Sequence, residues 1–163
     1  ALISMLLLNK DKQTPIADYL SEINIVPVSI SYEFDPCDTD KAIELAEKEA
    51  TGSYKKQEGE DLKSITQGLT GQKGRVHIEF CQPIQGEYAD SKAIAAAIDK
   101  AIISHYKLYD TNLVAHAKLN HLETNNTVLA LLNKRMENLT LEQQQWLLTM
   151  YANPVAAKQH LQP

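Results

Sequence analysis

The run Ile25-Val26-Pro27-Val28-Ser29-Ile30-Ser31-Tyr32-Glu33 is the most apolar and most β-branched stretch of the chain. Its side chains alternate with a period of two, which predicts a β-strand with one apolar face and one small, polar face. Pro27 has no amide hydrogen for a ladder bond, so it belongs at the start of the strand or on a sheet edge. The apolar face comprises Val26, Val28, Ile30 and Tyr32, and the small face comprises Pro27, Ser29 and Ser31.

A second strand is predicted at Arg75–Cys81, because apolar side chains occupy every second position there. Between the two strands the sequence predicts two helices, of which the first follows Asp35-Pro36 and ends at Gly52. The second of these helices has its apolar residues at Leu62, Ile65 and Leu69. From Asp90 onward no strand pattern recurs, and amphipathic spacing predicts helices for the remaining chain.

The fold class expected from this pattern is α/β. If the chain is a fragment of a larger domain, its own elements would resemble an α+β fold. Two strands alone are marginally stable in water, so we expect them to complete a larger mixed sheet with packed helices. Residues 1–89 would form the C-terminal part of an α/β domain, and residues 90–163 an all-helical region. The first helix of that region is predicted at Ser91–Tyr109, followed by a break at Asp110-Thr111-Asn112. A later helix that contains Trp146 is predicted to stop at Asn153-Pro154.

The first eight residues are apolar on nearly every side, which predicts a helix. Such a helix belongs in the core or on a membrane surface, and the core is favoured because no basic residues flank its start. No apolar run approaches the ~18 residues that a membrane-spanning helix needs. No signal peptide is visible either.

Composition narrows the functional classes. The chain has 163 residues and a net charge of −5, which is the length of one domain or of a piece of a larger one. An acidic chain is a poor general binder of nucleic acid, because it has no surplus of cations to neutralise phosphates. The two cysteines, Cys37 and Cys81, lack metal-ligand spacing. We therefore expect reduced thiols in a cytosolic protein, with neither a metal site nor a redox pair.

The two strand motifs together resemble a known family. Val26-Pro27-Val28, followed after an insert by Gly74-Arg75-Val76-His77-Ile78-Glu79-Phe80-Cys81-Gln82-Pro83-Ile84, is similar to the later part of a bacterial glycerolipid acyltransferase domain. In that family a hydrophobic-Pro-hydrophobic strand is the fourth sequence block. The resemblance extends over residues 1 to 90 and implies that Val26, Pro27 and Val28 help to form the wall of the substrate and acyl pocket.

The activity that the resemblance implies is acyl transfer in phospholipid biosynthesis. The acyl donor would be acyl-CoA or acyl carrier protein. The acceptor would be lysophosphatidic acid (1-acylglycerol-3-phosphate) or glycerol-3-phosphate. The reaction needs no metal or redox cofactor. Because its substrates are lipids, the protein is expected at the membrane surface, peripherally associated with the cytoplasmic face of the inner membrane.

The family's catalytic residues are not found at the expected place. Its His-x4-Asp block and its Glu-Gly-Thr-Arg-like phosphate-binding turn both precede the Val-Pro strand. Here only His105 has an Asp at that spacing, Asp110, and this pair follows the strand. His77 and Glu79 share one face of the second strand, where polar pairs usually face solvent. We therefore assign no catalytic residue within the chain and expect the His-x4-Asp block to lie before Ala1.

One set of cations qualifies as a phosphate-binding surface. If these side chains converge, they would meet anionic headgroups or a coenzyme A phosphate; if they do not, they form a solvated surface. The candidates are Lys55, Lys56, Lys63, Lys73 and Arg75.

Three interpretations of the whole chain stay open. The first is part of a glycerolipid acyltransferase. The second is a non-catalytic helical interaction module with a small α/β cap. The third is an unrelated α/β enzyme whose active site lies outside these residues.

Overall fold

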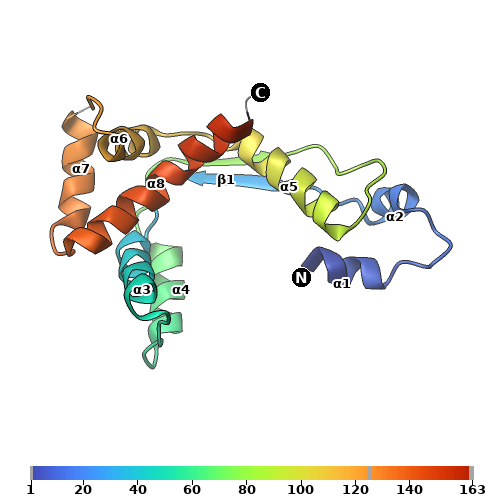
Figure 1. Ribbon diagram of the computed structural model, residues 1–163, viewed down its shortest axis with the longest axis horizontal. Helices are drawn as coiled ribbons and strands as arrows, with labels where there is room; N and C mark the ends of the chain where they lie inside the picture. The colour runs from blue at the N-terminus through green and yellow to red at the C-terminus, as the bar shows by residue number, and fades with distance from the viewer. Residues whose placement is uncertain (1, 125, 162–163) are drawn as a thin grey trace. The chain divides into compact units, whose positions relative to one another are not determined.

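The computed structural model describes residues 2–124 and 126–161. Within these residues the protein is mostly helical with one small sheet, an α-rich α/β fold (Figure 1). In chain order the elements are α1 (Leu2–Leu8), α2 (Ile16–Ile23), β1 (Val28–Tyr32), α3 (Asp38–Thr51), α4 (Glu60–Thr70), β2 (Val76–Phe80), α5 (Ser91–His105), α6 (Asp110–Leu119), α7 (Asn126–Met136) and α8 (Leu141–Leu161).

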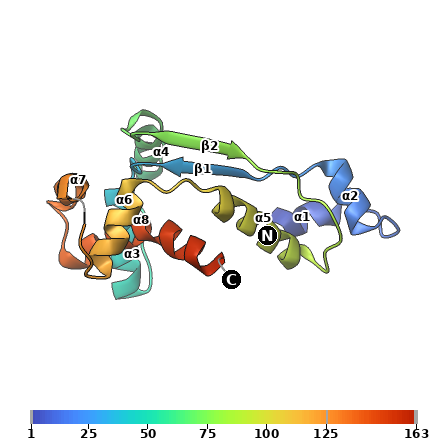
Figure 2. The same cartoon turned by 90° about the horizontal axis from the view of Figure 1, so that it is seen from above.

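The strands β1 and β2 lie side by side as an antiparallel pair (Figure 2). Their ladder includes a bond from Cys81 N to Pro27 O and one from Glu33 N to Arg75 O, each 2.9 Å long. Both strands lie within the ranges predicted from the sequence, which confirms their positions. Pro27 lies immediately before β1, the place expected for a residue that has no ladder donor.

The sheet buries its small face and leaves its apolar face open. Ser29 and Ser31 are fully buried, and Ser29 Oγ donates a 3.0 Å hydrogen bond to Ile102 O of α5. Small side chains let the backbone of α5 approach the sheet closely, and their hydroxyls need partners once they are buried. A strand of alternating pattern usually buries its apolar face, whereas this sheet buries the face that carries the serines. The exposed apolar residues are Val26, Ile30, Val76, Ile78 and Phe80.

The chain divides into two compact units. The first comprises the residues up to Ile30 together with His77–Lys107, and its core is built around Leu20, Ile84 and Ile94. The second comprises Ser31–Val76 and residues 108–161. Each unit thus takes residues from both sides of residue 90, where the sequence suggested a division.

The first helix is only partly a core helix. Ile3 and Leu7 of α1 pack against the core of the first unit, and Ser4 Oγ bonds Ser91 Oγ of α5. None of its described side chains is buried, and Leu2 and Leu8 are 70% and 81% exposed. The expected core location is therefore wrong for most of its surface, because α5 covers one face of the helix only.

The second unit is a helical bundle. Helix α8 packs against α3 and α6, and α6 also packs against α7 (Figure 1). Among the described residues after Asp90 all regular structure is helical, which confirms that part of the expected fold. The core of the bundle comprises Ala42, Val114, Ala115, Leu132, Met136, Leu147, Leu148, Tyr151 and Ala152.

Two helix boundaries differ from those predicted. Helix α6 begins at Asp110, where a break was expected, because Asn112 Oδ1 accepts a 2.8 Å bond from Tyr109 N and caps the helix start. Helix α8 continues through Pro154 to Leu161, so the predicted stop is wrong. Proline removes one helical hydrogen bond. Burial of Ala152 and Val155 on either side of it stabilises the continuous helix.

The bundle core provides a test of these assignments. Leu132 is fully buried in α7, whereas its neighbour Leu131 is 49% exposed. We expect Leu132→Ala to lower the free energy of unfolding by about 2–5 kcal/mol, because it leaves a cavity. Leu131→Ala is the matched control, with an expected loss below about 1 kcal/mol. Urea denaturation measures both, and equal losses would contradict the packing of α7.

Candidate functional site

The residues predicted to line an acyl pocket lie at the start of β1. Pro27 is buried, Val28 is half-buried and Val26 is 37% exposed. Val26 and Val28 belong to the open apolar face of the sheet, together with Ile30 and Phe80. The structure thus places Val26 and Val28 on the open face of the sheet and Pro27 on its buried face, so the three predicted wall residues do not face one way.

Neither of the two His-carboxylate combinations forms an enclosed site. His77 Nε2 lies 3.0 Å from Glu79 Oε2, but these side chains are 34% and 42% exposed, which is typical of a surface pair. His105 Nδ1 lies 2.8 Å from Ala101 O, so its ring is engaged by its own helix. Asp110 is the first residue of α6. These contacts provide no reason to assign a catalytic pair.

Metal and thiol chemistry receive no support from the arrangement of side chains. Within residues 2–124 and 126–161, no group of three or more His, Cys, Asp or Glu side chains is placed to hold a metal ion. Cys37 and Cys81 are both free thiols, and both are buried. Their sulfurs lie near backbone carbonyls, Cys37 Sγ 3.5 Å from Ser64 O and Cys81 Sγ 3.8 Å from Ala101 O.

The five predicted phosphate-binding cations divide into two kinds. Lys55 and Lys73 form no ion pair within the described part of the chain, and Lys73 Nζ donates to the carbonyls of Leu69 and Gly71. The other three are each paired with a carboxylate, which weakens their attraction for a phosphate. These pairs are Lys56 with Asp61 (2.5 Å), Lys63 with Asp40 (3.2 Å) and Arg75 with Glu33 (2.9 Å).

Arg75 is held by more than its ion pair. Glu33 Oε2 accepts bonds from both the backbone amide and Nε of Arg75, at 2.9 and 3.2 Å. The side-chain hydrogen bond from Arg75 is the largest reason that the pKa of Glu33 lies below its ordinary value. The guanidinium also lies over the Tyr109 ring, 5.1 Å from its centroid. Arg75 therefore connects the start of β2 with Glu33 and Tyr109.

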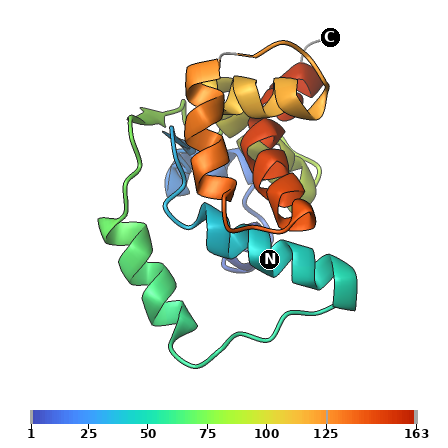
Figure 3. The same ribbon diagram turned by 90° about the vertical axis from the view of Figure 1, so that its left-hand side faces the viewer.

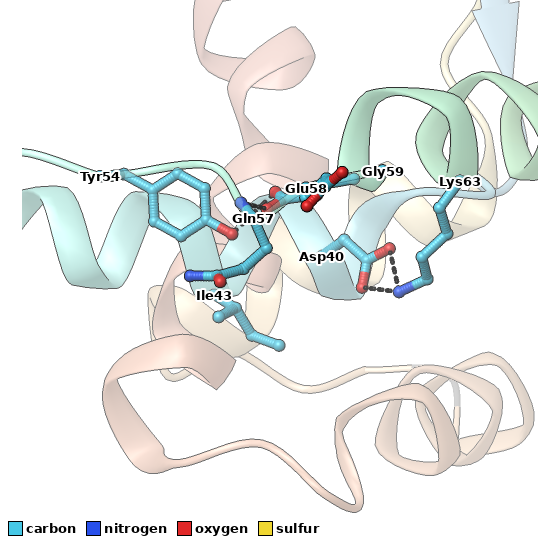
Figure 4. A pocket seen from close by; sticks show the side chains of 8 residues that line it. Asp40, Ile43, Tyr54, Gln57, Glu58, Gly59 and Lys63 are labelled. Atoms are coloured by element: carbon cyan, nitrogen blue, oxygen red, sulfur yellow. Dashed lines mark hydrogen bonds and ion pairs between the residues drawn. The ribbon is translucent and has the colours of Figure 1, made fainter.

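A pocket of 380 Å³ lies between α3 and the segment that leads into α4 (Figure 4). Its lining includes Asp40, Glu58, Glu60 and Lys63, so carboxylates outnumber the one cation. Glu60 accepts bonds from Gln57 N and Tyr54 Oη, which lower its pKa and raise the pKa of Tyr54 to about 12. Such a surface repels a phosphate group, so this pocket does not support a phosphate-binding role for Lys63.

The most buried charged group of the second unit was not singled out by sequence analysis. Asp38 is 1% exposed at the start of α3, and its carboxylate accepts bonds from Nε and Nη2 of Arg135 in α7. Tyr151 Oη of α8 donates a third bond at 2.7 Å, and Thr39 N donates a fourth at 2.7 Å. The carboxylate is thus fully compensated, as a buried charge must be.

The same residues hold the turn between β1 and α3. Arg135 Nη2 donates to Asp35 O at 2.9 Å, and the amide of Asp35 donates to Tyr151 Oη at 3.0 Å. Arg135 also lies over the ring of Phe34, 5.4 Å from its centroid. Three helices and one turn therefore meet at a single ion pair.

Burial and charge shift the titration of this cluster. Burial raises the pKa of Tyr151 above its ordinary range, and the nearby charge of Asp38 raises it further. Burial alone would lower the pKa of Arg135, but its hydrogen bonds to Asp38 and the charge of that residue outweigh this and raise it. The groups of the cluster bond to one another, so the cluster connects α3, α7, α8 and the turn before α3.

Sequence patterns contain no signal for this cluster. The sequence alone places Asp38 near the start of a helix, where the helix dipole favours an acidic residue without any partner. Arg135 lies 97 residues further along the chain and Tyr151 lies 113 residues further. Only the three-dimensional structure brings them together.

The ion pair predicts a large effect on stability. Arg135→Met leaves the Asp38 carboxylate buried without its charge partner, so we expect a loss of about 3–5 kcal/mol in the free energy of unfolding. The control Lys41→Met breaks the exposed pair with Asp35 and should cost less than about 1 kcal/mol. In the double variant with Asp38→Asn the losses should be clearly less than additive. Additive losses in urea denaturation would contradict the pairing.

The buried phenol predicts a pH dependence at alkaline pH. Since the pKa of Tyr151 is higher in the folded than in the unfolded protein, the neutral phenol contributes stability in full below the unfolded pKa of about 10. That contribution is lost as the pH rises above this value. We expect Tyr151→Phe to be less stable at neutral pH by about 1–3 kcal/mol and to lose stability less steeply above pH ~10. Identical slopes for parent and variant would contradict the buried location.

No described helix combines the length and the apolar character needed to cross a lipid bilayer. Comparison of the chain with protein-family models, with curated proteins and with solved structures found no match. Functional assignment therefore depends on the motifs in the sequence and on the surfaces described above.

Proposed function

We propose that the chain forms the C-terminal part of an acyltransferase that acylates 1-acylglycerol-3-phosphate or glycerol-3-phosphate. The main support is the resemblance carried by Val26-Pro27-Val28 and by the run from Gly74 to Ile84. In the structure these two motifs form the ends of one antiparallel strand pair, through the bonds Cys81 N to Pro27 O and Ile84 N to Ile25 O. Two motifs that are far apart in sequence thus belong to one structural element.

The open face of the strand pair also favours this function. Ile30, Ile78 and Phe80 are 44%, 54% and 73% exposed on that face. A contiguous apolar surface of this kind is normally covered in the working protein. In the proposal, further strands and helices of the acyltransferase domain cover it, and Val26, Pro27 and Val28 then form a wall of the acyl pocket. The sheet would be the larger mixed sheet expected from the sequence.

The proposed chemistry is transfer of an acyl group from a thioester to a hydroxyl. A His general base, oriented by an Asp, takes the hydroxyl proton of the acceptor, and the oxygen forms a bond to the thioester carbonyl carbon. The carbon–sulfur bond then breaks, and the leaving thiolate takes the proton to give a free thiol of coenzyme A or acyl carrier protein. In the proposal both catalytic residues belong to residues outside this chain.

The activity test compares the chain with its full open reading frame. Expressed from its own start codon, the reading frame should release thiol from acyl-CoA when lysophosphatidic acid is present. The 163-residue chain alone should release none above background, since it carries no general base. Thiol release is followed with a colorimetric thiol reagent. A reading frame that starts within a few residues of Ala1, or one without turnover, would contradict the proposal.

A variant within the chain tests the acyl wall. In the reading-frame enzyme, Val26→Asp places a charge in the proposed apolar wall and should lower kcat/KM about tenfold or more. Leu141→Asp is the matched control, because Leu141 is 79% exposed on α8 and has no role in the proposal. The proposed wall is rejected if both variants keep the activity of the parent.

The alternative function is a non-catalytic helical interaction module with a small α/β cap. It is favoured by one observation, the self-contained bundle of α3, α6, α7 and α8 with its own core and its buried ion pair. The buried residues of its core all lie within these four helices. The absence of thiol release from the full reading frame would leave this alternative as the better account.

A further inference from the structure

Helix α4 turns its apolar stripe away from the protein. Leu62, Ile65 and Leu69 are 70%, 60% and 77% exposed, and they lie within about 60° of one another around the helix axis. The opposite side of the helix makes the contacts with the protein. There, Gln67 Nε2 donates to Pro36 O at 2.6 Å, and Ser64 O accepts from Cys37 Sγ at 3.5 Å.

This orientation is the reverse of the usual one. An amphipathic helix at the surface of a globular protein normally buries its apolar stripe. In α4 the side that faces the protein is half-buried at Gln67 and Gly68 and carries no apolar side chain, and extended chain joins the helix to α3 and to β2 (Figure 3). The stripe is therefore available for an external contact.

The charge around α4 identifies the kind of surface that fits. The segment 53–75 has five cationic side chains, of which Lys56, Lys63 and Arg75 are paired with the carboxylates of Asp61, Asp40 and Glu33. Within this segment Asp61 is paired with Lys56, and Glu60 accepts bonds from its own neighbours. Lys55 and Lys73, which have no ion pair among the described residues, lie before and after the helix. An apolar stripe between two uncompensated cations is complementary to an anionic lipid surface.

We propose that α4 lies flat on an anionic membrane, with Leu62, Ile65 and Leu69 inserted at the level of the acyl chains. Lys55 and Lys73 then contact headgroup phosphates at the two ends of the helix. This surface gives a specific point of attachment for the peripheral location that the resemblance implies. It does not depend on acyl transfer, since vesicle binding and thiol release are separate measurements.

The experiment is co-sedimentation of the 163-residue chain with vesicles of phosphatidylglycerol and phosphatidylcholine. The parent should sediment with these vesicles and much less with pure phosphatidylcholine, and added NaCl should weaken its binding. Replacing all three stripe residues (Leu62→Gln, Ile65→Gln, Leu69→Gln) should lower the partition coefficient about tenfold or more. The pair Lys55→Glu and Lys73→Glu should lower it by a similar factor.

Each variant has a matched control elsewhere on the chain. For the stripe it is Leu122→Gln, Leu131→Gln and Leu141→Gln, which change three other exposed apolar side chains. For the cations it is Lys92→Glu and Lys118→Glu, which make the same change in net charge at exposed positions. Both controls should bind vesicles like the parent. Circular dichroism and thermal melting verify that the variants are folded.

Several results would overturn the proposal. It is wrong if the parent does not sediment with anionic vesicles, or if it binds neutral vesicles equally well. It is also wrong if the controls lose as much binding as the α4 variants. Light scattering of the parent and of the stripe variant adds a further criterion. A dimer that dissociates when the stripe is replaced would show that a second copy covers α4 instead of lipid.

Discussion

The bond between the Asp38 carboxylate and the Arg135 guanidinium is the constraint on which the second unit depends. A carboxylate that is 1% exposed must be compensated, and the two donors of Arg135 with the hydroxyl of Tyr151 supply this compensation. These partners come from α7 and α8. The start of α3 must therefore lie where the Asp38 carboxylate can reach both of them. Apolar contacts in the core are not directional, so they tolerate small shifts of one helix along another. A bidentate ion pair fixes both the distance and the orientation of its two groups.

Local sequence patterns predicted where the helices and strands lie better than they predicted which faces of these elements are buried. The alternation at 25–33 and 75–81 located both strands, and Gly52 ends α3 in a left-handed conformation as expected. Local patterns could not predict which face of the sheet is buried. Ser29 is buried because α5 covers it, and its hydroxyl donates to the carbonyl of Ile102, 73 residues further along the chain. Continuation of α8 through Pro154 likewise depends on tertiary packing, which outweighs a local preference.

The candidate site shows the same limit more strongly. Sequence identified the cations around α4 but not their partners, and partners decide whether a cation is available. The ammonium group of Lys63 is paired with Asp40, a residue of α3 that lies 23 positions earlier in the chain. The charge of Lys63 is therefore balanced within the protein. Lys55 and Lys73 have no carboxylate partner within the described chain. Composition alone treats all of these side chains as equivalent.

The open face of the β1–β2 pair has a consequence for how the chain behaves in isolation. Within the described residues the sheet has two strands, so each strand also has an edge whose backbone groups are unpaired. An edge next to exposed Ile78 and Phe80 is a template on which other chains can add strands. When these residues are produced by themselves, the strand edges and the apolar face are therefore both open to association with other chains, with cross-β aggregation as the hazard.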